Sequence, residues 1–138
     1  MHRSSGSCAC GHIQYTISGP ALQVVACHCG MCRRMTGAPF SSYVVVKEGD
    51  LDVASTEGTL AGYAVTERTT RHFCRRCGTP VFNANPHSYQ GLAMVYLGTV
   101  QGHETLAPGI AIYCESKLPW VSLPDVARQF DAGPKRPS

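Results

Sequence analysis

The chain has 138 residues, of which 43% are hydrophobic and 15% are charged, and its formal net charge is +3 at pH 7. This length favours one domain, and the hydrophobic fraction is sufficient to fill a core. The small positive excess does not indicate a nucleic-acid partner, and the longest apolar run, around Tyr43–Val46, is far shorter than the ~20 residues that span a bilayer. The composition therefore argues against fibrous and transmembrane proteins, and neither nucleic acid nor a membrane is an expected partner.

The two ends of the chain differ in composition from its middle. The segment Met1–Ser7 has no apolar run behind its arginine, so no secretory signal is expected, and the predicted localisation is cytoplasmic. The tail after Phe130 contains two prolines and no large apolar residue, which is typical of a mobile end. We therefore predict one ordered domain over residues 7–130, with flexible termini at 1–6 and 131–138.

Between these limits the hydrophobic pattern mostly has a period of two. The segment His12–Ser18 places Ile13, Tyr15 and Ile17 on one face, which is typical of a half-buried strand. The predicted strands, in chain order, cover residues 12–18, 22–26, 40–46, 51–54, 60–65, 68–73, 81–84, 92–97 and 109–114. Gly, Pro and Asn separate these strands at short intervals, which indicates antiparallel strands rather than βαβ units.

Helical segments are few. One helical turn is expected at 31–35, and a second helix at 123–129, with Ser122 as a candidate cap and Pro124 in the first turn. The sequence thus predicts a small, mainly β domain of two packed sheets.

Cysteine is the residue type that points most directly to chemistry. The chain has 8 cysteines, and in a reducing compartment disulfides rarely persist, so metal ligation is the leading role. Their pattern is Cys8-x-Cys10, Cys27-x-Cys29-x-x-Cys32, Cys74-x-x-Cys77 and a separate Cys114. The alternative is a secreted domain held by disulfides, but two of the clusters are too tightly spaced for easy internal bridges.

The segment Cys74-Arg-Arg-Cys77-Gly78 has the spacing of a zinc knuckle. Two thiolates three positions apart can bind one metal, and the following glycine relieves the tight turn. Cys8 and Cys10 form a second pair that would complete four ligands and close a long loop. The alternatives for these cysteines are unligated thiols or a redox pair.

The cluster Cys27-His28-Cys29-Gly-Met-Cys32 offers three thiolates within a few residues. Three protein ligands with an exchangeable fourth position are the pattern of a catalytic zinc. The alternatives are a closed structural site, with Cys114 or His28 as the fourth ligand, or a cluster that binds no metal.

Several arginines lie within or beside the cysteine clusters. They are Arg33, Arg34, Arg71, Arg75 and Arg76. Cations at these positions favour thiolate over thiol and attract an anionic ligand to an open metal position. The alternative is that each is a solvated surface residue.

Four segments carry a family resemblance. They are Gly6-Ser-Cys-x-Cys-Gly11, Cys27-His-Cys-x-x-Cys-Arg-Arg-x-x-Gly-Ala-Pro-Phe40, Phe73-Cys-x-x-Cys-Gly-Thr-Pro80 and Glu115-Ser-Lys-x-Pro-Trp120. With these motifs in this order, the chain resembles the glutathione-dependent formaldehyde-activating enzymes, also called the centromere-protein-V/Gfa family. Four motifs over nearly the whole chain are far more specific than any single pair of cysteines.

The resemblance implies a compact β fold of the kind shared with Rab nucleotide-exchange chaperones and methionine sulfoxide reductases of type B. It implies one structural zinc ion and a second, exchangeable one. The implied ligands are Cys8, Cys10, Cys74 and Cys77 for the first ion, and Cys27, Cys29 and Cys32 for the second. The activity it implies is the making or breaking of the carbon–sulfur bond that joins formaldehyde and glutathione in S-hydroxymethylglutathione.

Two positions depart from the family pattern. Ala111 stands where many relatives carry histidine, and Cys114 stands where a hydrophobic residue is more usual. The departure at Ala111 leaves open either altered chemistry or ordinary strand variation. We expect Cys114 to be a buried strand residue and not a metal ligand.

The leading functional hypothesis is a zinc-dependent carbon–sulfur lyase-like enzyme that acts on a small thiol such as glutathione. In this hypothesis the three clustered cysteines are catalytic, Arg33 and Arg34 bind the carboxylates of the thiol substrate, and His28 or a water molecule supplies the proton. The alternative is a non-catalytic, zinc-stabilised binding module. A third possibility is zinc storage or redox sensing by the same cluster.

Overall fold

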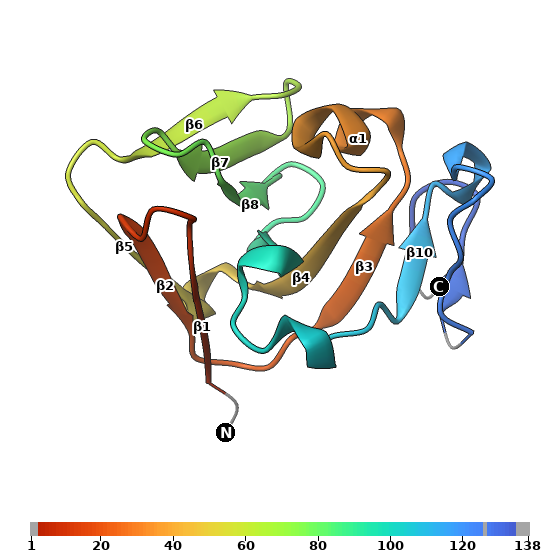
Figure 1. Ribbon diagram of the computed structural model, residues 1–138, viewed down its shortest axis with the longest axis horizontal. Helices are drawn as coiled ribbons and strands as arrows, with labels where there is room; N and C mark the ends of the chain where they lie inside the picture. The colour runs from red at the N-terminus through yellow and green to blue at the C-terminus, as the bar shows by residue number, and fades with distance from the viewer. Residues whose placement is uncertain (1–2, 126, 135–138) are drawn as a thin grey trace.

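The computed structural model describes residues 3–125 and 127–134, and most of its regular secondary structure is strand (Figure 1). A three-stranded sheet has the order β1 (Ser4–Ser7), β2 (Ile13–Ile17), β5 (Leu51–Ser55). An eight-stranded sheet has the order β11 (Arg128–Gln129), β10 (Ile110–Ile112), β3 (Gln23–Cys27), β4 (Ser41–Lys47), β9 (Leu92–Tyr96), β8 (Pro80–Ala84), β7 (Thr70–Cys74), β6 (Leu60–Ala64). The predicted mainly β fold with two sheets is confirmed.

Helical structure is short. The α-helix α1 spans Gly30–Thr36, and four 3-10 turns cover Glu48–Asp50, Leu97–Thr99, His103–Thr105 and Cys114–Ser116. The predicted helical turn at 31–35 is confirmed as part of α1. No helix within the described ranges has the length and apolar character needed to cross a membrane.

The main core lies between the two sheets. In β2, Ile13, Tyr15 and Ile17 are almost fully buried while the residues between them are exposed, as the alternation predicted. These side chains pack with Val44 and Val46 of β4 in one apolar cluster. Burial of the apolar surface between the two sheets is the main favourable contribution to the free energy of folding.

The opposite face of the large sheet forms a second, smaller cluster. In β4, Tyr43 alternates with the core residues and packs with Tyr96 of β9, their rings meeting edge to face with centroids 5.0 Å apart. Cys27 and Cys32 belong to the same cluster. The large sheet therefore separates the core from the region in which three of the cysteines meet.

Regular structure begins before residue 7, the predicted start of the ordered domain. Residues 4–7 form β1, in which Ser4 is opposite Ile17 of β2. Their polar composition gives no strand signal, because this strand is held by backbone hydrogen bonds. Gly6 is required there, since a Cβ atom would collide with the Tyr15 hydroxyl and the Thr99 carbonyl.

At the other end, the backbone oxygens of Asp131 and Ala132 accept hydrogen bonds from Glu115 and Tyr113, so residues 131 and 132 are not free of the domain. Residues 135–138 of the predicted flexible tail lie outside the described residues.

The predicted helix at 123–129 is also wrong. Arg128 and Gln129 form β11, and the N–H groups of Arg128 and Phe130 donate to the carbonyls of Gly109 and Ala111. The free edge of β10 thus satisfies backbone groups that a helix would have satisfied internally.

The expectation of purely antiparallel pairing is wrong as well, because β10 is parallel to both β3 and β11. The segment 97–109 leads from β9 to the other side of β3, where β10 begins. The hydrophobic period of a strand gives no information about the direction in which the strand runs.

Candidate functional site

The first cysteine cluster, called here the tetrathiol cluster, consists of Cys8, Cys10, Cys74 and Cys77. Its four Sγ atoms all lie within 4.8 Å of one another, and Cys10 Sγ is 3.6 Å from the Sγ atoms of both Cys8 and Cys74. Sulfur ligands around a tetrahedral zinc ion with ~2.3 Å bonds are ~3.8 Å apart. The Ile13 N–H donates to Cys8 Sγ at 3.3 Å. The donor set therefore fits a four-coordinate metal ion.

The turn after β7 presents two of these sulfurs. The Cys77 N–H donates to Cys74 Sγ at 3.4 Å, and the Gly78 N–H donates to the Cys74 carbonyl at 2.7 Å. Gly78 has φ of 80°, the left-handed conformation that glycine adopts without strain. Hydrogen bonds from the side chain and backbone of Thr79 lower the pKa of Cys77 to about 5. The turn stabilises the thiolate form that a metal requires.

The second cluster, called here the trithiol cluster, consists of Cys27, Cys29 and Cys32, and its Sγ atoms also lie within 4.8 Å of one another. Cys27 is the last residue of β3, Cys29 is the N-cap of α1, and Cys32 lies in α1. The Cys32 N–H donates to Cys29 Sγ at 3.2 Å, and the Sγ atoms of Cys27 and Cys32 are 3.2 Å apart. The junction between strand and helix thus gathers three sulfurs from one short segment.

The sulfurs of the trithiol cluster differ in acidity. Hydrogen bonding with Cys27 lowers the pKa of Cys32 to about 6, and a hydrogen bond with Tyr43 acts in the same direction. The hydrogen bond with Cys32, together with burial, raises the pKa of Cys27. A negative charge is therefore best accommodated on Cys32.

A chain of buried hydrogen bonds ends at the trithiol cluster, and the cysteine motifs gave no indication of it. The Tyr96 hydroxyl donates to Asn83 Oδ1 at 2.9 Å, Asn83 Nδ2 donates to the Tyr43 hydroxyl oxygen at 3.5 Å, and that oxygen lies 3.2 Å from Cys32 Sγ. All three side chains are buried. The available signal was Asn83, a polar residue inside the apolar strand β8, since buried polar groups need partners.

A cavity of about 510 Å³ opens beside the trithiol cluster. Cys27, Cys29 and Cys32 line it, as do Tyr43 and Asn83. The three sulfurs are therefore accessible to a small molecule that enters the cavity. The tetrathiol cluster lines neither this cavity nor the polar groove of about 710 Å³ beside β1 and β2.

The arginines assigned to substrate binding do not line the cavity. Arg33 Nη1 donates to the carbonyls of His28 and Ser116, at 2.7 and 2.8 Å, and so ties the start of α1 to the 3-10 turn at Cys114–Ser116. Arg34 is exposed on α1. Sequence proximity to the cysteines did not show where these long side chains point.

His28 does not occupy a position from which it can serve the cavity. Its side chain is fully buried, neither ring nitrogen has a hydrogen-bond partner among the described residues, and its ring packs on Phe40 with centroids 5.0 Å apart. Burial lowers the pKa of His28, and the positive charges of Lys117 and Arg33 add to the effect. The proposed role of His28 as proton donor is therefore not supported by its position.

Cys114 belongs to neither cluster within the described part of the chain. It is half-buried in a 3-10 turn, because the strand ends at Ile112 and Tyr113 adopts a left-handed conformation with φ of 54°. The expectation of a buried strand residue is thus wrong. Ala111 is fully buried in β10.

A match to a known protein family shows the family to which the chain belongs. The family described as glutathione-dependent formaldehyde-activating enzyme matches residues 3–116, a range that contains both cysteine clusters. The chain belongs to this family. The resemblance stated from the sequence motifs is confirmed.

Two relatives give further context. A Schizosaccharomyces pombe protein described as an uncharacterized lyase is 29% identical over 86 residues, which are 61% of this chain and 59% of that protein. The match thus spans less than two thirds of the length of this relative. A Rhodobacter sphaeroides protein of known crystal structure has a TM-score of 0.56 and 22% identity, covering 71% of this chain and 88% of that one. At this identity the likeness shows the fold alone.

Proposed function

We propose that this family member is a zinc-dependent enzyme of the carbon–sulfur lyase type, which forms or breaks the bond between a thiol and an aldehyde. The reference substrate is S-hydroxymethylglutathione, the adduct of glutathione and formaldehyde. The observation that carries the proposal is the convergence of Cys27, Cys29 and Cys32 at the wall of a cavity of about 510 Å³. This arrangement gives a bound thiol direct access to the sulfur cluster.

The proposal assigns one structural zinc ion to the tetrathiol cluster and one exchangeable ion to the trithiol cluster. Three protein ligands leave a coordination position for a substrate. When bound there, zinc would supply a Lewis acid that favours the thiolate of the substrate and polarises the aldehyde oxygen. All eight cysteines are free, which agrees with a reducing, cytoplasmic compartment as part of the proposal.

The reaction needs no oxidant or reductant. In synthesis, the thiolate sulfur donates an electron pair to the aldehyde carbon and the carbon–sulfur bond forms. The π electrons of the carbonyl move to oxygen, which takes up the proton that the thiol released. In cleavage the carbon–sulfur bond breaks, its electron pair remains on sulfur, and the hydroxyl proton returns to the thiol.

Tyr43 is the residue that we assign to the oxygen of the adduct. Tyr43 lines the cavity beside the trithiol cluster, and its hydroxyl oxygen is 3.2 Å from Cys32 Sγ. Because Asn83 donates to the Tyr43 oxygen, the proton of Tyr43 is directed toward the cluster. Burial raises the pKa of Tyr43, so the hydroxyl stays protonated and can donate to a developing oxygen anion. Tyr43 thus takes the role of proton donor that the sequence-based hypothesis assigned to His28 or water.

The test combines metal counting with a direct assay. Native mass spectrometry should find two zinc ions per chain, one of them labile and retained better in the presence of glutathione. Nuclear magnetic resonance should detect faster exchange between free formaldehyde plus glutathione and S-hydroxymethylglutathione when the protein is added. The Cys114→Ser variant is the matched control, because Cys114 belongs to neither cluster, and it should behave like the parent protein.

One zinc ion per chain with no acceleration of the exchange would contradict the enzymatic proposal. That result would favour the alternative of a non-catalytic, zinc-stabilised binding module.

A further inference from the structure

We infer that the aldehyde half of the substrate is an apolar chain or ring that ends in an acidic group, seated on the sheet face between the trithiol cluster and Arg128. The inference rests on the proposed function for the reacting carbon and sulfur. It replaces the one-carbon aldehyde of the reference substrate with a larger one, and the evidence is the lining, size and charge of the cavity.

The lining of the cavity is largely apolar. The apolar residues that line it include Val25, Val45, Met94, Ile110 and Ile112 of four neighbouring strands of the large sheet, and Phe130 just after β11. The register explains why they share one face, since Ile110 is opposite Val25 and Val45 is opposite Met94. Such a surface favours ligands that bury carbon atoms and disfavours polar groups that would lose water without gaining partners.

The size of the cavity exceeds the need of formaldehyde. Its volume of about 510 Å³ lies within the range of sites for ligands of drug size, ~300–1,000 Å³. It extends along β3 from Cys27 past Val25 to Gln23, a backbone distance of ~13 Å at ~3.3 Å per residue. A one-carbon aldehyde would contact only the end of this surface at the cluster.

Arg128 supplies the charge at the remote side. Among the described residues that line the cavity it is the one with a charged side chain. It lies opposite Ile110, which lies opposite Val25, so its Cα is two strands from β3 and ~12 Å from that of Cys27. Its guanidinium is 5.4 Å from the ring centroid of Phe130, and it pairs with no carboxylate in the part of the chain that the structure describes. It is therefore free to bind an anion.

The charged groups of glutathione find little complement inside this cavity. Arg33 is engaged by two backbone carbonyls and Arg34 lies outside the lining, so the described residues that line the cavity near the cysteines include no cation for its carboxylates. We assign the peptide half of the adduct to the part of the lining at Met31, which is 44% exposed. The apolar half then occupies the interior.

The experiment measures binding of compounds that cannot react. Calorimetric titrations of the protein as purified, with octanoate, octanamide and acetate, separate chain length from charge. Octanoate should bind at least about tenfold more tightly than acetate, because its methylene groups are buried, and about threefold more tightly than octanamide, because it pairs with an exposed arginine. Equal affinity for octanoate and acetate, or no binding of octanoate, would overturn the inference.

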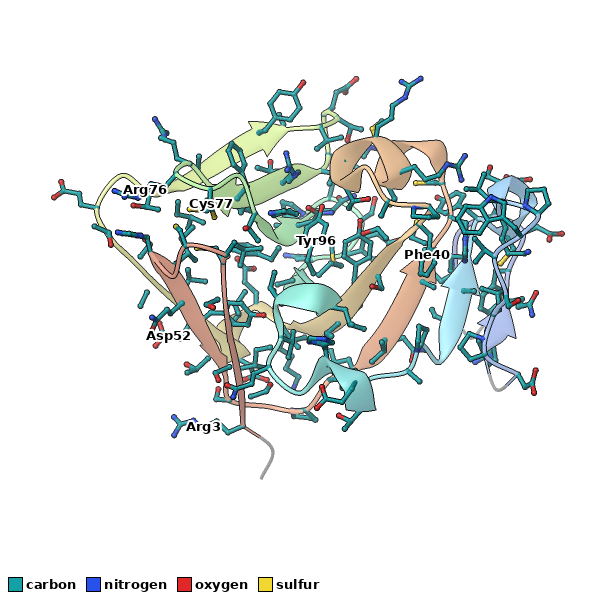
Figure 2. The ribbon with its side chains drawn as sticks, in the orientation of Figure 1. Arg3, Phe40, Asp52, Arg76, Cys77 and Tyr96 are labelled. Carbon is teal, nitrogen blue, oxygen red and sulfur yellow. The ribbon has the colours of Figure 1, made fainter. Side chains whose placement is uncertain are left out.

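Amino-acid substitutions test whether Arg128 binds the acidic group of the ligand. Arg128→Gln should abolish the preference for octanoate over octanamide, while Arg3→Gln, an equal change of charge at an exposed residue near the N-terminus (Figure 2), should retain it. Gln23→Glu adds a negative charge to the lining with little change of shape and should also abolish the preference. A preference that persists in both Arg128→Gln and Gln23→Glu would place the acid elsewhere and contradict the inference.

A measurement of enzymatic activity separates this inference from the proposed function. Glutathione adducts of 8-oxooctanoate and of formaldehyde are compared as substrates. Turnover of the formaldehyde adduct without octanoate binding would overturn the inference and leave the proposed function intact. Octanoate binding without turnover of either adduct would support the pocket assignment and contradict the proposed function.

Discussion

The two cysteine clusters lie on opposite faces of the large sheet and differ in how the chain assembles them. The tetrathiol cluster joins segments 64 residues apart, counted from Cys10 to Cys74, and its buried members belong to the main core. The trithiol cluster comes from one short segment and lines a cavity. Ligands from distant segments restrict the unfolded chain and so suit a structural role. Ligands from one segment leave the rest of the coordination sphere to a substrate.

Loss of the tetrathiol cluster should have the largest effect. In Cys74→Ser, a fully buried ligand is removed from the core, and we expect no soluble, cooperatively unfolding protein. Binding of a structural zinc ion is worth ~10–16 kcal/mol in small zinc domains, comparable with the ~5–15 kcal/mol of stability of a whole domain. Thermal unfolding and zinc content measure the outcome, with Cys114→Ser as the control. A soluble Cys74→Ser protein with an unchanged melting temperature would contradict the structural assignment.

Loss of the trithiol cluster should remove activity and spare the fold. Serine is a favourable N-cap, so Cys29→Ser keeps the cap of α1 while it removes a sulfur ligand. We expect a cooperative melt, one retained zinc ion per chain, and a fall in lyase activity greater than the ~10–100-fold that loss of an outer-shell metal partner costs. Aggregation of this variant, or retention of two ions, would show that the ligands belong to different sites from those assigned here.

Substitution of two buried tyrosines, Tyr43 in β4 of the large sheet and Tyr15 in β2 of the small sheet, sharpens the comparison. Tyr43→Phe removes the hydroxyl beside Cys32, and we expect kcat to fall about a hundredfold with little change in KM, as for loss of an oxyanion donor. Tyr15→Phe is the control, because its hydroxyl bonds to Thr99 at 2.7 Å in the core next to the tetrathiol cluster. Each variant should lose about 1 kcal/mol of stability. Equal kcat values for the two variants would remove Tyr43 from the reaction.

The fold was predictable from sequence wherever burial alternates along a strand. In β2 and β4 every second side chain enters the core, and this period is visible in the residues themselves. Strands β1 and β11 were missed because their place depends on backbone hydrogen bonds to β2 and β10. Nothing in their side chains encodes such pairing.

The candidate site was predictable to the extent that its parts are local. Cysteine spacing indicated the trithiol cluster and each pair of the tetrathiol cluster, since ligands on one turn or one strand–helix junction are close for any such chain. That the two distant pairs meet was expected only because each pair alone leaves a zinc ion two ligands short. The Tyr96–Asn83–Tyr43 network was missed because it depends on which residues of β4, β8 and β9 are neighbours in the sheet. The contacts of Arg33 were not predictable for a similar reason, since its carbonyl partner at Ser116 is distant in sequence.

The smallest expected effect distinguishes a positioning arginine from a substrate-binding one. Arg33→Met keeps the length of the side chain but removes the donor to the carbonyls of His28 and Ser116. Because these carbonyl groups lose a charged hydrogen-bond donor, we expect the free energy of unfolding to fall by about 1–2 kcal/mol. KM for S-hydroxymethylglutathione should change less than about twofold, because hydrogen-bonded Arg33 lies outside the cavity lining. Arg34→Met, on the exposed side of α1, is the control and should change stability by no more than about 0.5 kcal/mol. A tenfold rise of KM in either variant with unchanged stability would instead restore the sequence-based view, in which these arginines bind the carboxylates of the thiol.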